Sequence, residues 1–110
     1  MEKLDYRQLI KSLLKEHVKY PLRDESVETQ LIFDTENDHY QLVHIGWQGE
    51  KRIYACPIHI DIKDGKIWIQ RDFSEVGIAQ QLVEQGVPKS DIVLSFRSPF
   101  VRQFSEFAIA

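Results

Sequence analysis

The sequence predicts an α+β fold: an antiparallel β-meander of four to five strands with an N-terminal helix, a second helix after strand four and a short C-terminal helix. Three observations predict it. Residues 1–20 repeat apolar side chains at helical spacing, residues 27–71 alternate apolar and polar side chains between short turns, and residues 74–110 contain a second amphipathic segment and a serine–proline helix start. The length of 110 residues suits one domain, and we expect residues 1–110 to form it.

The N-terminal helix is predicted to have one apolar and one basic face. Apolar side chains recur three or four residues apart from Tyr6 to Val18, and Pro21 is expected to end the helix. The basic residues follow one another at steps of four: Lys3, Arg7, Lys11, Lys15 and Lys19. Such a row suits an anionic partner, either DNA phosphate or an acidic protein surface. We favour the alternative, a solvated helix face, because Asp5 and Glu16 dilute the charge.

Four strands are predicted at residues 27–35, 39–47, 52–63 and 66–71, followed after the second helix by a short fifth at 91–96. Asp64-Gly65 is a strong signal for a two-residue hairpin turn. This turn pairs Ile62 with Ile67 and Ile60 with Ile69, which places them together with Ile58 on one buried face because side chains alternate along a strand. Cys56 has the same parity, so we expect a buried structural thiol.

The first half of the sheet is predicted to be apolar on both faces. One face carries Val27, Leu31, Phe33, Tyr40 and Leu42, and the other carries Ile32, Val43, Ile45 and Trp47. A sheet with two apolar faces needs two covers. One cover is expected to be a helix, and the other is either a second helix or a partner chain.

The C-terminal third is predicted to contain two helices. Ser74 is expected to cap a helix over residues 75–85, with Gly86 ending it. Ser98-Pro99 is typical of another helix start, and Phe100, Phe104 and Phe107 follow at helical spacing. These phenylalanines suit either a core or an exposed anchor for a partner.

No strong catalytic or cofactor motif is present. His17, His39, His44 and His59 do not have the spacing of a strong metal motif, so we expect no metal site. The glycines form no phosphate-binding loop, and no cofactor is expected. The best catalytic candidate is the trio His59, Asp61 and Trp68 on one sheet face, but an exposed polar ladder gives the same pattern. We therefore expect no enzymatic activity.

Composition points to a cytoplasmic protein. Cys56 is the single cysteine, whereas secreted domains of this size usually carry several. The sequence has neither a signal-peptide pattern nor an apolar run of the ~20 residues that cross a bilayer. The formal net charge of −3 makes the chain a poor candidate for gripping DNA alone.

The sequence resembles the XisI family, the fdxN-element excision controlling factors of cyanobacteria. The resemblance runs through most of the chain and is carried by QLIFDT at 30–35, DHYQL at 38–42 before Gly46-Trp47, IDIKDGKIWIQ at 60–70, GIA at 77–79, GVPK at 86–89, DIVL at 91–94 and FAIA at 107–110. The chain departs from the family pattern at Phe73, Ser74 and Ser95, where glycine, threonine and glycine are expected.

The resemblance implies an accessory or regulatory role in excision of a DNA element by a site-specific recombinase. It also implies a companion protein, XisH, and no assigned catalytic residue. We expect the chain to bind an XisH-like protein, itself, or both, and to meet DNA only indirectly through a recombinase complex. The interface anchors expected from residue type are Trp47, Trp68, Phe100, Arg102 and Phe104. Two alternatives are an enzyme or nuclease subunit using the His59, Asp61 and Trp68 face, and a direct DNA binder using the basic helix face.

Overall fold

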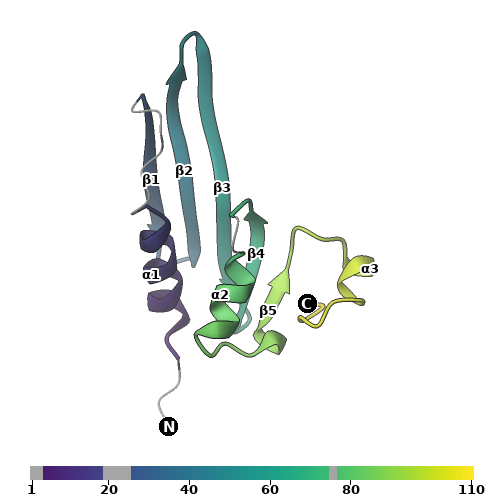
Figure 1. Cartoon of the computed structure of the whole chain (residues 1–110). Coiled ribbons are helices and arrows are strands. Elements are labelled where there is room, and N and C mark those ends of the chain that lie inside the picture. Colours follow the sequence, from purple (N-terminus) through teal and green to yellow (C-terminus); the bar gives the residue numbers. More distant parts are fainter. Residues whose placement is uncertain (1–3, 19–25, 75–76) are drawn as a thin grey trace.

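The computed structural model describes residues 4–18, 26–74 and 77–110 of the chain. Figure 1 shows one β-sheet with helices in front of it and a C-terminal extension beyond its edge. The elements are α1 (Tyr6–Val18), β1 (Val27–Asp34), β2 (His39–Gln48), β3 (Lys51–Lys63), β4 (Lys66–Asp72), α2 (Ile78–Glu84), the 3₁₀ turn η1 (Lys89–Asp91), β5 (Ile92–Leu94) and α3 (Pro99–Arg102). The predicted α+β fold is confirmed. Within the described residues, none of the helices has the length and apolar character that crossing a membrane requires.

The sheet has the strand order β1-β2-β3-β4-β5. The first four strands form the predicted antiparallel meander. β5 instead runs parallel to β4, with Ile67 opposite Ile92 and Ile69 opposite Leu94. This pairing was not predicted, and it follows from α2, which carries the chain back along the sheet before β5 begins. The C-terminal tail extends the same edge, since Ala108 bridges to Val93.

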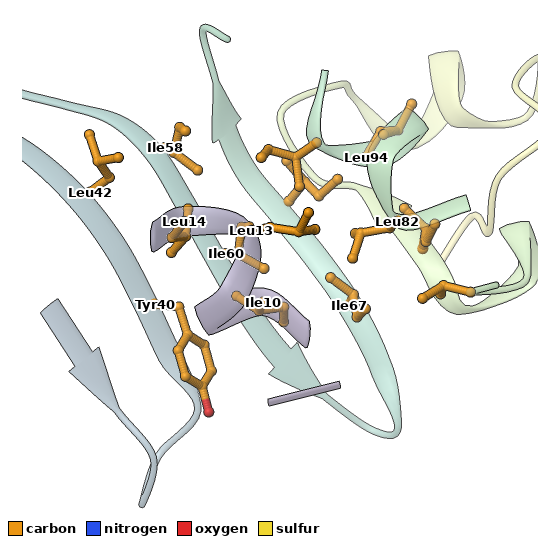
Figure 2. Packing of buried hydrophobic residues seen from close by; sticks show 14 residues of the cluster. Ile10, Leu13, Leu14, Tyr40, Leu42, Ile58, Ile60, Ile67, Leu82 and Leu94 are labelled. Atoms are coloured by element: carbon orange, nitrogen blue, oxygen red, sulfur yellow. The ribbon is translucent and has the colours of Figure 1, made fainter. Parts of the chain in front are cut away.

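The hydrophobic core lies between one sheet face and two helices. α1 supplies Ile10, Leu13 and Leu14, and α2 supplies Ile78 and Leu82, all of which are buried. Figure 2 shows the α1 side chains directed at the buried strand residues, which include Tyr40, Leu42, Ile58, Ile60 and Ile67. Both helices therefore cover the same face. The opposite face, which we call the outer face, is not covered by either of them.

The β3–β4 hairpin has the predicted turn and register. Asp64 and Gly65 both have positive φ, 54° and 76°, as a type I′ turn requires. Ile60 faces Ile69 and Ile62 faces Ile67, as predicted.

A β-bulge in β3 moves Cys56 to the outer face, so its predicted position on the core face is wrong. Leu42 pairs with Ile58, but His44 pairs with Ala55, which leaves two β3 residues opposite a single residue of β2. The extra residue reverses the alternation on one side of the bulge. Cys56 therefore lies half-buried in a hollow with Gln41 and His59.

The second helix begins later than predicted. α2 starts at Ile78 with Gly77 as its N-cap, and Ser74 does not cap it. Asp72 accepts the backbone hydrogen bond of Ile78 at 2.7 Å, while the Ser74 hydroxyl accepts that of Gly77 at 3.2 Å. Residues 75 and 76, which the prediction included in the helix, lie outside the described residues. The predicted end is confirmed, because Gly86 has φ 99° and Val87 donates to the Leu82 carbonyl in a Schellman motif.

Candidate functional site

Two histidines and an aspartate meet on the outer face. Hydrogen-bonding register places His39 of β2 opposite Asp61 of β3, and His59 lies two residues from Asp61 on the same side of β3. The Asp61 Oδ1 atom is 2.8 Å from His39 Nδ1 and 2.9 Å from His59 Nε2. One carboxylate oxygen thus contacts both imidazole rings.

Neighbouring polar side chains hold this group in place. Gln70 donates to Asp61 Oδ2 at 3.1 Å and accepts from the Ser95 hydroxyl at 2.8 Å. Gln41 Nε2 lies 3.4 Å from His59 Nδ1. The hydrogen bond to Asp61 raises the pKa of His39 above its usual value, since the carboxylate favours the charged ring.

The structure modifies the predicted catalytic trio. His59 and Asp61 are brought together, and Trp68 lies opposite Asp61 on β4. The Trp68 indole N–H, however, donates to the Lys63 carbonyl at 3.2 Å and does not join the polar group. The third member of the polar group is His39 rather than Trp68. Sequence reasoning missed His39 because the β2–β3 register depends on the bulge near Cys56, which no local motif announces.

Cys56 is poorly suited to nucleophilic chemistry. Burial raises the pKa of its thiol, which favours the unreactive protonated form. The sulfur donates to the Ile58 carbonyl at 3.2 Å. It therefore adds no activated nucleophile beside His59.

The remaining histidines lie on the helix-covered side of the sheet. His44 Nδ1 is 3.0 Å from the Thr29 hydroxyl, and His17 Nε2 is 3.1 Å from Gln81 Oε1. Both line a cleft together with Phe73. Burial lowers the pKa of His44, so its neutral form is favoured.

The C-terminal segment exposes Phe100 and Phe104 most strongly, and Phe96 is 48% exposed. Ser98 caps α3 as predicted, accepting from Val101 N at 3.3 Å, but the helix ends at Arg102. Phe104 lies beyond it, so the predicted helical spacing extends too far. The side chains of Phe100 and Phe104 are 67% and 77% exposed and stack edge to face at 5.4 Å. We call this pair the phenylalanine patch.

Arg102 holds the C-terminal segment in place through hydrogen bonds to its backbone. Its guanidinium donates to four backbone carbonyls, those of Leu94, Ser95, Arg97 and Ile109, at 2.9–3.3 Å. It also lies 5.9 Å from the Trp68 ring centroid. Two of the expected anchors, Arg102 and Trp68, thus lie close to each other, and the phenylalanine patch contains the two most exposed aromatic side chains of this segment.

A second exposed aromatic region lies at the far end of the sheet. Trp47 and Tyr54 are 51% and 75% exposed there on the outer face, whereas the exposed Ile32 lies opposite Gln41, near the polar group. Arg52 packs over the Trp47 ring at 5.3 Å. The predicted apolar character of this face is therefore present in the folded chain.

The basic row is only partly available to a partner. Arg7 makes two hydrogen bonds with Asp38, at 2.7 and 3.1 Å, and Lys11 is half-buried. Lys15 is exposed. Lys3 and Lys19 lie outside the described residues. The described part of the row thus presents less positive charge than the sequence alone indicates.

These features define a small α+β protein with one sheet, helices on one face and exposed aromatic and polar groups on the rest. The XisI protein family model matches residues 1–109, and the chain belongs to the XisI family.

Two solved structures are similar over nearly the whole chain. A XisI-like protein from Anabaena variabilis ATCC 29413 shares 48% sequence identity, with 96% of each chain covered and a TM-score of 0.90. The fdxN element excision controlling factor XisI from the same organism shares 36% identity, with 96% of each chain covered and a TM-score of 0.84. No curated protein matches the chain significantly.

Proposed function

We propose that this chain is a non-catalytic regulatory protein in the excision of a DNA element and acts by binding an XisH-like companion protein. It would act as one domain in the cytoplasm, associate with itself, with the companion or with both, and meet DNA only through a recombinase complex. Membership of the XisI family and similarity to an excision controlling factor support the regulatory part of the proposal.

The observation that carries the binding role is the phenylalanine patch. Large aromatic side chains are favoured as interface anchors, and contiguous exposed apolar patches mark interaction sites. Phe100 and Phe104 stack together while most of each ring faces solvent. The bonds of Arg102 to four backbone carbonyls fix the segment that presents them, which reduces the entropy lost when a partner binds.

The alternative of an enzyme or nuclease subunit receives less support. Asp61 is already bonded to both His39 and His59, and the adjacent thiol of Cys56 is kept protonated by its raised pKa. The arrangement lacks an activated nucleophile among these groups. We therefore assign the polar group no catalytic role.

The experiment compares the double variant Phe100→Ser/Phe104→Ser with the parent by titration calorimetry against a purified XisH-like protein from the same organism. We expect an affinity loss of about 10-fold or more, because central aromatic anchors dominate interface energies. Sedimentation of each protein alone measures self-association in parallel. Circular dichroism checks that the variants are folded.

Phe73→Ser is the matched control, since Phe73 is as exposed as Phe104 but lies beside the cleft that His17 and His44 line, outside both exposed aromatic regions. It should bind like the parent. A folded double variant that associates as well as the parent would remove the patch from the interface. A parent that stays monomeric and does not bind the XisH-like protein would overturn the binding role itself.

A further inference from the structure

We propose that His39, His59 and Asp61 form a binding site for a divalent transition metal of the zinc class. One ligand atom from each of the three residues lies within 4.8 Å of the other two, and Asp61 Oδ1 is 2.8 Å from His39 Nδ1 and 2.9 Å from His59 Nε2. Two imidazole nitrogens and one carboxylate are a common donor set for such ions. This inference concerns the outer face and is independent of the proposed partner interface.

The strands place the three donors so that they converge. β2 contributes His39 and β3 contributes His59 and Asp61, and antiparallel pairing fixes their relative positions. Bonds of about 2.0–2.2 Å to zinc put neighbouring donor atoms of a tetrahedral site roughly 3.3–3.5 Å apart. The two donor separations of 2.8 and 2.9 Å reach that range through small side-chain rotations.

Surrounding residues provide the outer contacts that metal ligands need. Gln70 holds the second Asp61 oxygen, and Ser95 in turn holds Gln70. When His59 binds metal through Nε2, its Nδ1 carries the proton and needs an acceptor. Reversing the Gln41 side-chain amide, which lies 3.4 Å away, presents its oxygen to that proton.

The site is accessible from solvent. The His39 side chain is 54% exposed and that of Asp61 is 16% exposed, so an ion reaches the donors from solvent while the carboxylate stays fixed. The nearby cations are engaged with aromatic rings: Lys63 lies 5.3 Å from the Trp68 centroid and Arg71 lies 5.5 Å from that of Phe73. Three protein donors leave a position for water or for a group from a bound partner.

The proposed site disagrees with the prediction from the sequence that the chain has no metal site. The spacing rule that disfavoured a metal considers ligands close together along one helix or loop. Here strand pairing brings His39 next to His59 and Asp61. Asp61 lies 22 positions further along the chain than His39. The donor set therefore exists only in the folded protein.

The test is zinc titration of the purified, chelator-treated full chain with any affinity tag removed, followed by calorimetry. We expect one ion per chain, and His39→Gln or Asp61→Asn should weaken binding at least about 10-fold. Cobalt added in place of zinc should give the visible absorption of a nitrogen–oxygen site. The conservative replacements retain hydrogen-bonding groups, and circular dichroism reports whether they fold.

Two controls locate the ion. His44→Gln removes a histidine from the other sheet face, and Cys56→Ser removes the thiol beside His59. Both should bind zinc like the parent. Failure of the parent to bind an equimolar ion, or equal losses in His44→Gln or Cys56→Ser, would overturn the site. None of these measurements uses the companion protein, so the outcome is separable from that of the partner interface.

Discussion

Gly65 occupies a backbone conformation that other residues adopt at a cost. Its φ of 76° lies in the left-handed region, and a Cβ placed there meets no atom within 4 Å. The cost of a substitution is therefore conformational rather than steric. Gly65→Val should lower the free energy of unfolding by about 1–3 kcal/mol, measured by urea denaturation. Lys51→Val is a control at an exposed strand position without positive φ, and an unchanged midpoint for Gly65→Val would contradict the turn's importance.

Individual residues also show where sequence reasoning ends. Asp64-Gly65 was predictable because positive φ at two successive positions is a local requirement that few residue pairs meet. The orientation of Cys56 was not, because one inserted residue in β3 reverses every side chain on one side of it. His39 was missed as a neighbour of Asp61 for a related reason, since its position depends on the register of two long strands.

Among the elements, α1 depends on polar contacts at its ends as well as on its buried face. The Tyr6 hydroxyl donates to Asp91 Oδ2 at 2.6 Å and so joins α1 to η1, 85 residues away. Burial, followed by this hydrogen bond, raises the pKa of Tyr6 to about 12. An unfolded tyrosine ionises near pH 10. The stabilisation from Tyr6 should thus be complete below about pH 10 and be lost between pH 10 and 12.

Tyr6→Phe should accordingly lower the free energy of unfolding at pH 7 by about 1 kcal/mol, because the solvent at this half-buried site weakens the bond. It should also lose less stability than the parent between pH 10 and 12, as measured by urea denaturation across that range. Tyr40, whose pKa is likewise about 12, still causes part of the stability loss between pH 10 and 12 in the variant. Tyr54→Phe is the control, and a Tyr6→Phe pH profile as steep as the parent's would contradict the assignment.

Elements defined by local sequence signals were predicted more accurately than those that depend on contacts between distant parts of the chain. Strands β1 to β4 were located within a residue or two because alternation and turns are local signals. The start of α2 was misplaced because Asp72, at the end of β4, binds the first helical N–H in place of Ser74. The parallel pairing of β5 was missed because it arises from the return path of α2 along the sheet.

In the whole molecule, the two sheet faces have different surroundings. α1 and α2 cover one face and bury the core there. The outer face keeps polar groups near β3 and aromatic side chains at the far end, while the phenylalanine patch projects from the C-terminal segment. The polar group, the exposed aromatic side chains of the outer face and the phenylalanine patch thus all lie outside the core. That distribution agrees with the proposed binding role.

The charge of the whole molecule argues against tight binding to duplex DNA by the isolated chain. The net charge is −3, and Arg7, the residue of the basic row nearest the start of α1, is paired with Asp38 at 2.7 Å. Binding to DNA phosphates requires several unpaired cations in one patch. We expect a dissociation constant weaker than about 1 μM at physiological salt, measured by fluorescence anisotropy with labelled duplexes. Lys11→Glu/Lys15→Glu should leave the weak residual signal nearly unchanged. A submicromolar constant that falls steeply with salt and is abolished by this double variant would instead assign DNA contact to α1.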